Sequence, residues 1–475
     1  MPSSQRSRND SAAVALPEGA PMPVKALRKV SVLVLSWNGR KHLEICLPAL
    51  QAQEDPGIDW DVRVLDNGSF DDTVEWMRRE HPWVRLTALE VNRGFCGGNE
   101  LLVEGAEDAD AVVFLNNDTR PGPDWLARLV AAYREAPGDV AAVSGGIVDW
   151  DGKRLDFAQG LLTFDGHAFQ KDYRRPLDQV TLPEAGHELL FACGGNMIVD
   201  RRIFKDLGGF DRTFFAYLED VDLGWRLWAA GYRVTFAPDA VVHHRSMATS
   251  QALGNANRGF LFERNAFSTV YKNFDDEMFR LLMPAVLMTL IHRNQTLLVQ
   301  NNPGGELLTL DPYAGLVANT AAPEPQHAVD EEEGVGPAPP PKQGPPRTSL
   351  GEKWRGYGPR EFVKRAVRKG LRVVLPGWVF ADAGPTTHIV DPRTFAQLQA
   401  TTYLLGRKDE LADARARTQA RRVRSDRDIF AKFPLVLVPT YPGDEDLFAS
   451  RAFRELLPDG VPIETYRLDE IMALD

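Results

Sequence analysis

The stretch Phe114-Leu-Asn-Asn-Asp-Thr119 decides the fold of this chain. It closes the apolar run from Ala111 to Leu115, which stops abruptly at two Asn residues and one Asp. The pattern predicts a buried strand that ends in the carboxylate of Asp118. Ligands of open α/β sheets bind beyond the carboxyl ends of the strands, and Mg²⁺ and Mn²⁺ prefer oxygen ligands. Asp118 is therefore a candidate metal ligand, although Asx residues after a strand are also common turn formers.

Polar residues follow two earlier apolar runs in the same way. The run from Lys29 to Ser36 is rich in β-branched residues, which predicts a strand buried on both faces, and it ends in Trp37-Asn38-Gly39-Arg40. A second strand is predicted from Val62 to Leu65, before Asp66-Asn67-Gly68-Ser69. Strand ends of this kind gather at one edge of a parallel sheet.

Three more segments carry residues suited to ligand binding. The loop from Asn92 to Asn99 (NRGFCGGN) is rich in glycine, which lets the backbone approach a ligand closely. GGFD, from Gly208 to Asp211, precedes YLEDVD, from Tyr217 to Asp222. The apolar run at Val241-Val242 is followed by two imidazoles, His243 and His244.

The order SWNG, LDNGS, NRGFCGGN, LNNDT, GGFD, EDVDL and a late His before Ser resembles the inverting family 2 glycosyltransferases, from about Val30 to Ser250. Asn116 stands in place of the first Asp of the family's usual DxD, as in relatives that resemble rhamnosyl- or galactofuranosyltransferases. The resemblance implies an α/β fold of the GT-A type, with a Rossmann-like, mostly parallel sheet flanked by helices. A helical C-terminal extension is expected to follow.

The resemblance also implies a donor site with a divalent cation, Mg²⁺ or Mn²⁺. The metal is expected on Asp118 and His243, because Ser246 follows His243 by three; His244 stays open as the alternative ligand. Asp66 is expected to contact the nucleoside, with an Asx turn as the alternative, and Arg93 the phosphates, with a surface salt bridge as the alternative. The expected donor-binding residues are Ser36, Trp37, Asn38, Asp66, Arg93, Asn116, Asn117 and Asp118.

By the same resemblance, Asp220 of the Glu219-Asp220 pair is the catalytic base. Adjacent carboxylates in a partly dry pocket raise the pKa of one of them towards neutrality, which suits a base. The alternative is that these acids only cap the N-terminus of a helix. Gly194, Gly195 and Asp222 are expected to line the pocket for the acceptor and the transferred sugar.

These expectations define a metal-dependent, inverting and non-processive glycosyltransferase (EC 2.4) of surface polysaccharide or glycolipid synthesis. Its donor is a UDP-, dTDP- or GDP-linked sugar, and its acceptor a saccharide or a lipid-linked saccharide. A processive polymer synthase is disfavoured because no QxxRW follows EDVDL. The alternatives are a sugar-nucleotide pyrophosphorylase, disfavoured by the missing phosphate loop, and a non-catalytic GT-A-like binding protein.

Composition bounds the location and the partners. The chain has 475 residues, a formal net charge of -11 and a pI near 5.4, so no nucleic-acid partner is expected. The three cysteines show neither paired nor metal-ligand spacing, which predicts reduced thiols in a cytoplasmic protein. The apolar run from Leu281 to Ile291 is too short to span a bilayer. It is either a buried helix or an interfacial helix that holds the enzyme peripherally at the inner face of the cell membrane.

The predicted organisation has five parts. They are a disordered tail at 1–27, a GT-A catalytic domain at 28–250, a helical extension at 251–310, a Pro/Gly/acidic linker at 311–350 and a mainly helical region at 351–475. The last part carries the arginines Arg415, Arg417, Arg421, Arg422, Arg424 and Arg427. They form either a solvated helix face or a contact for anionic lipid or a pyrophosphate-bearing acceptor.

Overall fold

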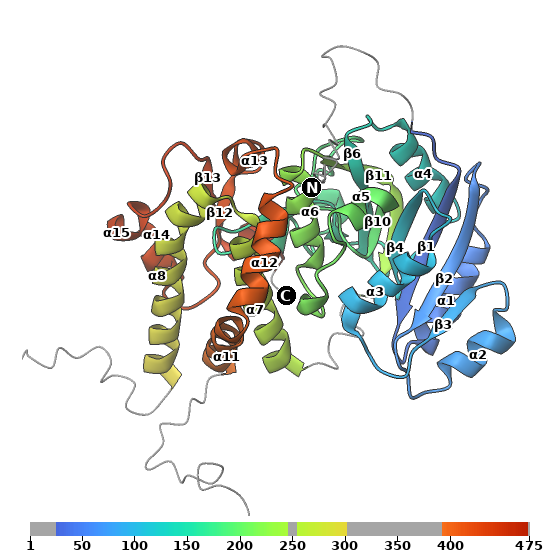
Figure 1. The fold of residues 1–475 in the computed structure, drawn as a ribbon, viewed down its shortest axis with the longest axis horizontal. Helices are drawn as coiled ribbons and strands as arrows, with labels where there is room; N and C mark the ends of the chain where they lie inside the picture. Colours follow the sequence, from blue (N-terminus) through green and yellow to red (C-terminus); the bar gives the residue numbers. More distant parts are fainter. Residues whose placement is uncertain (1–24, 246–253, 302–391, 474–475) are drawn as a thin grey trace, which may run out of the picture. The chain divides into compact units, whose positions relative to one another are not determined.

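The computed structural model describes residues 25–245, 254–301 and 392–473 (Figure 1). The predicted linker at 311–350 and nearly all of the predicted tail at 1–27 lie outside the described residues. The described residues up to Leu298 and those from Pro392 onwards belong to one compact unit, and the predicted division of the chain into five parts stays a prediction.

One edge of the main sheet consists of parallel strands in the order β3-β2-β1-β4. The strand predicted from Lys29 is β1, and the other two predicted strands are β2 and β4. Ser36 pairs with Asp66 and Leu35 with Asn116, so the three strands end together. The elements of this part are β1 (Lys29–Ser36), α1 (Arg40–Gln51), β2 (Asp59–Asp66), α2 (Thr73–Glu80), β3 (Arg85–Ala88), α3 (Gly94–Gly105) and β4 (Ala111–Asn116).

The sheet continues through strands of mixed direction, in the order β10-β6-β11-β5, and β7 pairs with β6. It is therefore a mixed sheet, whereas the sequence predicted a mostly parallel one; the α/β class with flanking helices is as predicted. The elements are β5 (Thr119–Pro121), α4 (Trp125–Glu135), β6 (Val140–Asp149), β7 (Leu155–Phe157), β8 (Gly160–Leu162), β9 (Ala168–Gln170), η1 (Leu177–Gln179), β10 (Asn196–Asp200), α5 (Arg201–Asp206), η2 (Arg212–Phe214), α6 (Glu219–Ala229) and β11 (Arg233–His244).

The remainder of the described chain is mainly helical. The C-terminal region also contains a short parallel pair, β12 and β13, which begins at the strand predicted from Leu435. The elements are α7 (Gly254–Asn273), α8 (Asp276–Asn301), α11 (Pro392–Gly406), α12 (Lys408–Gln419), α13 (Asp426–Lys432), β12 (Leu435–Leu437), α14 (Asp444–Ala449), α15 (Arg451–Arg454), β13 (Ile463–Thr465) and α16 (Leu468–Ile471).

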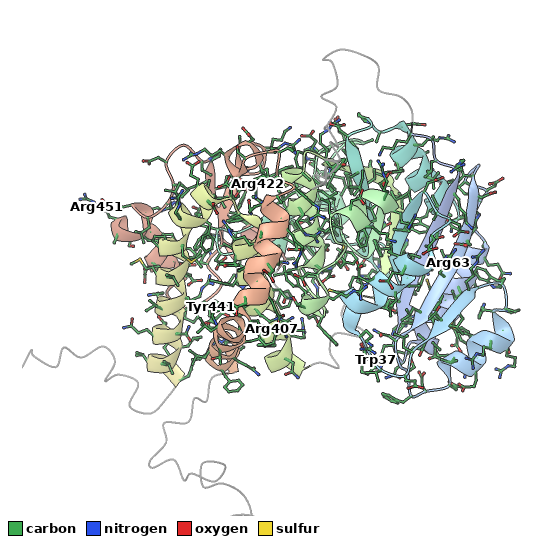
Figure 2. The ribbon with its side chains drawn as sticks, in the orientation of Figure 1. Trp37, Arg63, Arg407, Arg422, Tyr441 and Arg451 are labelled. Carbon is green, nitrogen blue, oxygen red and sulfur yellow. The ribbon has the colours of Figure 1, made fainter. Side chains whose placement is uncertain are left out.

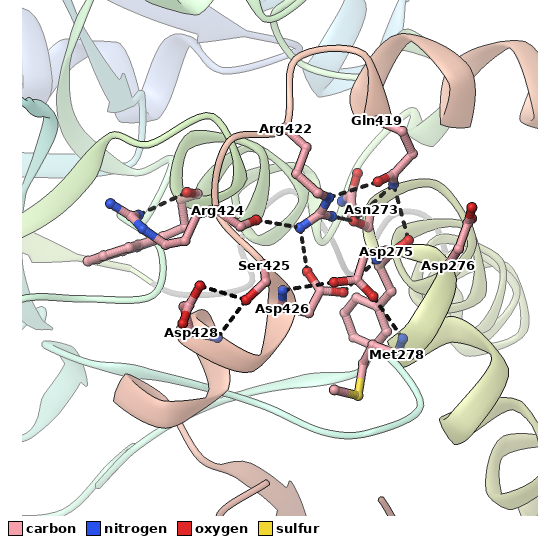
Figure 3. A network of polar contacts seen from close by, with 12 residues as sticks. Asn273, Asp275, Asp276, Met278, Gln419, Arg422, Arg424, Ser425, Asp426 and Asp428 are labelled. Carbon is pink, nitrogen blue, oxygen red and sulfur yellow. Dashed lines mark hydrogen bonds and ion pairs between the residues drawn. The ribbon is translucent and has the colours of Figure 1, made fainter. Parts of the chain in front are cut away.

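Side chains of the C-terminal region cap the last turn of α7 (Figure 3). The final carbonyls of a helix have no partner inside the helix and need one from elsewhere. Arg415 donates to the carbonyl of Phe274 at 2.8 Å, and Gln419 donates to the same carbonyl at 3.1 Å. Arg422 donates to the carbonyl of Asn273 and pairs with Asp426 at 2.6 Å. The cations also suit the negative end of the helix dipole.

A buried charge network makes a second junction. Arg293 of α8 pairs with Asp165, before β9, at 2.9 Å and with Asp444 of α14 at 3.0 Å. His167 lies 3.2 Å from Asp165 and 3.7 Å from Glu263 of α7. Since removal of one partner leaves a buried charge uncompensated, this network fixes the helices against the catalytic domain.

The apolar run from Leu281 to Ile291 lies within α8. None of the helices in the described parts of the chain is long and apolar enough to cross a membrane. Leu282, Ala285 and Val286 are buried, whereas Leu281, Leu287 and Ile291 are 38, 45 and 66% exposed. The helix thus has a buried face and a separate exposed apolar stripe.

Candidate active site

The ends of β1 and β2 form a cross-braced edge. Asp66 is only 1% exposed, and Ser69 engages both of its carboxylate oxygens, through the backbone N–H at 2.9 Å and the hydroxyl at 2.5 Å. The Ser69 hydroxyl also accepts the N–H of Asn38 at 2.7 Å. This geometry is the Asx-turn alternative, and the contact of Asp66 with a nucleoside stays a prediction.

An aromatic pair stands beside this edge. Asn38 adopts a left-handed backbone (φ 48°), and its side-chain oxygen accepts the N–H of Phe70 at 3.0 Å. The rings of Trp37 (Figure 2) and Phe70 meet edge to face at 6.1 Å, and Phe70 is 84% exposed. Exposed aromatic surface of this kind suits the flat face of a nucleobase. The sequence prediction included Trp37 but not Phe70.

Asn67 ties the glycine-rich loop to the same edge. Its amide nitrogen donates to the carbonyl of Gly94 at 3.0 Å, and its oxygen accepts the backbone N–H of Arg93 at 2.8 Å. The side chain of Arg93 is exposed, which leaves its guanidinium accessible for a phosphate.

The side chain that meets Asp118 is that of His244. Its Nε2 lies 3.2 Å from Asp118 Oδ1, and its Nδ1 lies 2.9 Å from Asp156 Oδ2. His243, the ligand assigned from the sequence, instead points its Nδ1 at the carbonyl of Trp150, 3.2 Å away. The physical reason is that successive side chains of a strand point to opposite faces, so only one of two neighbouring histidines on β11 can reach the sheet edge.

The three remaining donor-edge residues are Ser36, Asn116 and Asn117, and they lie around this pair. The amide of Asn116 is 3.4 Å from His244 Nε2, and that of Asn117 donates to the Ser36 hydroxyl at 3.0 Å. Ser36, Asn116, Asn117 and Asp118 therefore form one contiguous group, and their role in donor binding stays a prediction.

The pair of Asp118 and His244 fits a divalent cation. Two neighbouring ligands of an octahedral ion at about 2.1 Å lie about 3 Å apart, close to the 3.2 Å found here. Metal-bound imidazoles usually donate their other N–H to a carboxylate, and Asp156 is in that position. Among the described residues no group of three or more His, Cys, Asp or Glu side chains could hold an ion. The other ligands would have to be water or substrate phosphate.

Burial and charge set the protonation of this pair. Burial disfavours the charged imidazole, but Asp118 and Asp156 outweigh it and raise the pKa of His244 to about 10. Burial likewise disfavours the Asp118 carboxylate, yet His244 keeps the pKa of Asp118 below its usual value. The site therefore holds a carboxylate with a positive charge beside it, a charge that a cation would replace.

Glu219 and Asp220 are the first two residues of α6. The Gly194-Gly195 turn lies between this acidic pair and the site of Asp118 and His244. Asp220 is half-buried and accepts the N–H of Gly194 at 3.1 Å. A Cβ on Gly194 would lie 3.9 Å from the Cβ of Asp220, and a Cβ on Gly195 would lie 2.9 Å from the Asn116 amide. The turn thus joins the acidic pair to the donor edge, and a side chain at Gly195 would displace the amide of Asn116.

Burial raises the pKa of both acids, but the neighbouring groups act differently on each. Burial, and then the charge of Asp220, raise the pKa of Glu219 to about 8, and Glu219 Oε2 has no hydrogen-bond partner among the described residues. Burial also raises the pKa of Asp220, but the N–H groups of Gly194 and Val221 oppose this shift. A neutral Glu219 beside an ionised Asp220 is the distribution that a base at Asp220 requires.

The loop before this pair is strained and braced from α7. Phe215, Tyr217 and Leu218 all have positive φ, 65°, 73° and 63°. The buried amide of Asn265 donates to the carbonyls of Phe214, Ala216 and Tyr217 at 3.2, 2.9 and 2.8 Å. Sequence reasoning missed Asn265, because nothing in its neighbourhood in the sequence marks it.

Asp222 does not line the pocket with Asp220, contrary to the sequence prediction. Residues that are two positions apart on a helix are separated by roughly 200° around its axis, so the Asp220 and Asp222 carboxylates leave opposite faces of α6. Asp222 is fully buried and pairs with Arg226 at 2.7 Å and Lys272 at 2.9 Å. Burial disfavours the ionised form, but these two cations outweigh it and lower the pKa of Asp222. Its position is that of a buried structural ion.

Comparison with known proteins identifies the class. Residues 111–271 match the model of glycosyl transferase family group 2. An N-acetylglucosaminyl-diphospho-decaprenol L-rhamnosyltransferase of Mycobacterium tuberculosis is 29% identical over 240 residues, 46% of this chain and 77% of the relative. An O-antigen biosynthesis protein of Myxococcus xanthus is 32% identical over 236 residues, 47% of this chain and 18% of that protein.

Among solved structures, a mannosyltransferase of Pyrobaculum calidifontis in complex with GDP-Man and Mn²⁺ aligns with a TM-score of 0.41 and 18% identity. The alignment covers 82% of this chain and 91% of that chain. The matched family model makes the enzyme class a glycosyltransferase, as predicted, and not the alternative pyrophosphorylase.

Proposed function

We propose that this chain, a glycosyltransferase with the family 2 domain over residues 111–271, transfers one sugar at a time from a nucleotide-diphosphate donor to an acceptor hydroxyl, with inversion. The observation that carries the proposal is the half-exposed Asp220 carboxylate, joined by the Gly194-Gly195 turn to the pair of Asp118 and His244. A base and an electrophilic site on either side of one small turn suit a single displacement at an anomeric carbon.

Asp220 acts as the base in this proposal. One carboxylate oxygen is oriented by the N–H of Gly194 and the other by that of Val221 at 2.9 Å, while lone pairs remain to accept the acceptor's proton. The O–H bond of the acceptor breaks as its oxygen forms the new bond to the anomeric carbon. The bond from that carbon to the diphosphate breaks, and the diphosphate leaves with the electron pair.

The leaving diphosphate needs positive charge, which this chain supplies in two ways. Asp118 and His244 would hold Mg²⁺ or Mn²⁺, which when bound neutralises the charge on the diphosphate oxygens. The exposed guanidinium of Arg93 is available to the same oxygens. Trp37 and Phe70 offer the aromatic surface for the base of a UDP, dTDP or GDP donor.

For the acceptor, we infer a saccharide on a lipid carrier, with a hexose or deoxyhexose as the transferred sugar. Support comes from the mycobacterial relative, which is named for rhamnose transfer to a diphospho-decaprenol acceptor. The exposed stripe of Leu281, Leu287 and Ile291 on α8 suits peripheral contact with a membrane that carries such an acceptor.

The test compares Asp220→Asn with Asp239→Asn. The Asp239 carboxylate is 75% exposed and is not among the proposed donor, metal or base residues. We expect Asp220→Asn to bind donor and Mn²⁺ like the parent in calorimetry, and to transfer sugar about 10² to 10⁴ times more slowly. Asp239→Asn should behave like the parent in both measurements. Transfer by Asp220→Asn at the parental rate would overturn the assignment of the base.

A panel of donors tests which nucleotide the enzyme uses and whether it needs a metal ion. Thermal shifts with UDP-, dTDP- and GDP-sugars, each with Mn²⁺ or with EDTA, identify the nucleotide. Full transfer in excess EDTA would refute metal dependence while leaving the base intact.

A further inference from the structure

A cavity of about 450 Å³ lies on the other side of α6 from the catalytic base. Its walls are the loop from Leu207 to Thr213, the buried faces of α6 and α7, and the helices α11 and α12. Asp222 belongs to its wall, and Asp220 leaves α6 from the opposite face. None of the described residues that line the cavity belongs to the donor edge, so it is a separate site of the size that small-molecule ligands occupy.

The lining is rich in cations. Among the described residues that form it, seven are basic and four are acidic. Four of the basic side chains have carboxylate partners. These pairs are Arg212 with Glu104, Arg226 with Asp222, Lys272 with Asp211, and Arg407 with Glu410.

Three guanidinium groups lack such a partner. No carboxylate in the described ranges lies within ion-pairing distance of Arg264, Arg417 or Arg421, and all three line the cavity. Arg417 lies on α12 and Arg421 lies two residues beyond its end. Both are exposed, and Arg421 donates to the Arg417 carbonyl at 3.2 Å, so the two lie together at the rim.

The arginine run of the C-terminal region thus divides into two groups. Arg415 and Arg422 cap α7, Arg424 donates to the carbonyl of Trp228 at 2.8 Å, and Arg427 pairs with Glu277 at 2.8 Å. These four are structural. Among the described residues, the Arg421 side chain donates only to the carbonyl of Arg417, at 3.2 Å and near the surface, and neither Arg417 nor Arg421 pairs with a carboxylate. These two arginines are therefore the candidates for binding a ligand.

Arg264 is the buried member of these three arginines. It is 6% exposed, lies over the rings of Tyr403 and Phe260 at 5.0 and 5.2 Å, and donates to the carbonyl of Phe214. A buried cation without an anion is costly, and an incoming anion would offset that cost. The cavity therefore has one desolvated guanidinium inside and two at its mouth.

We propose that this cavity binds a ligand that carries a phosphate or diphosphate group. Guanidinium groups bind phosphate oxygens in pairs of parallel hydrogen bonds, and three of them along one cavity match an extended anion better than a single carboxylate. The ligand is the headgroup of an anionic lipid or a soluble phosphate compound. The proposal does not depend on the proposed function of Asp220 and Asp118.

The experiment measures pyrophosphate binding by calorimetry in EDTA, with the full chain carrying Arg93→Ala, so that neither a metal ion nor the donor-site guanidinium contributes. The double variant Arg417→Ala/Arg421→Ala removes the two rim cations. Its matched control, Arg451→Ala/Arg454→Ala, removes two cations from α15; Figure 2 labels Arg451 there and Arg407 at the cavity. A second arm measures sedimentation with vesicles of phosphatidylglycerol and phosphatidylcholine, against phosphatidylcholine alone.

We expect a loss of binding of roughly tenfold or more in the rim variant and none in the control, with unchanged melting temperatures. Loss in the pyrophosphate arm assigns a soluble ligand, and loss confined to the vesicle arm assigns a lipid headgroup. Absence of binding in both arms, or equal weakening in both double variants, would overturn the proposal.

Discussion

Asn265→Ala tests whether the strained loop positions the base. A non-glycine residue in the left-handed region costs about 1–2 kcal/mol, so Phe215, Tyr217 and Leu218 together store roughly 3–6 kcal/mol. The Asn265 amide holds three carbonyls of this loop. Arg264 still donates to the Phe214 carbonyl in the variant, so the Ala216 and Tyr217 carbonyls are the ones that lose their donor. A buried acceptor left without a partner costs about 1–3 kcal/mol. The lost contacts are thus comparable with the stored strain, and we expect the loop to relax.

Relaxation of this loop moves the first turn of α6, which carries Asp220. A misplacement of about 1 Å costs about 10²-fold in rate. We therefore expect kcat to fall about a hundredfold in a transfer assay, while the Kd for the donor stays within about threefold of the parent. The donor edge, from Ser36 to Asp118, has no hydrogen bond to Asn265 among the described residues.

The control is Thr289→Val, which removes a buried hydrogen bond to the Ala285 carbonyl, at 2.9 Å, from another helix. It should lower stability in denaturant titrations without a comparable loss of kcat. Suppose that Asn265→Ala loses as much stability as Thr289→Val but keeps kcat within threefold of the parent. Asn265 is then not needed to position the base, and the proposed role of the loop is refuted.

Three further outcomes are expected. Asp222→Asn should lower the free energy of unfolding by about 3–5 kcal/mol in urea, because it leaves two buried cations undercompensated; parental stability would contradict this. His244→Ala should abolish stimulation by Mn²⁺ while His243→Ala retains it, and an equal loss in both would argue against our ligand assignment. Burial lowers the pKa of His167, but the carboxylates beside it outweigh burial and raise that pKa to about 10. Its stabilisation is therefore complete below about pH 6.5 and is lost as the pH rises through about 10. Unfolding measured between pH 6 and 10 should show a smaller decline for His167→Gln than for the parent, and equal declines would count against it.

The strand ends could be predicted because each depends on a local pattern. An apolar run followed by Asx or Ser marks the carboxyl end of a strand, so Ser36, Asp66 and Asn116 were found from their own neighbourhoods. The choice between His243 and His244 could not be made in this way. β11 has register shifts, one of them between Ala237 and Val242, so the alternation cannot be counted from the start of the strand.

Residues recruited from distant parts of the chain were missed. Asp156 lies on the three-residue strand β7, and it is the pairing of strands in the sheet that brings its carboxylate to His244. Asp222 belongs to the same sequence motif as Asp220. Its side chain leaves the opposite face of α6 because of helical geometry, which the motif alone does not show. The pairing of Arg264 and Asn265 with the Phe214 loop depends on how α7 packs, which no local pattern encodes.

The caps on α7 make this a naturally divisible enzyme. Arg415 reaches the carbonyl of Tyr271 from 144 positions further along the chain, and Trp225 packs at 4.8 Å on Phe274 and at 4.9 Å on Phe430. The described residues up to 301 and those from 392 are thus held together by side-chain contacts and not only by the peptide chain. Co-expressed fragments that together contain all described residues should therefore associate through these contacts. A gene fragment that ends at residue 301 would keep every proposed catalytic side chain and still lose its scaffold, because the folding unit is larger than the family domain.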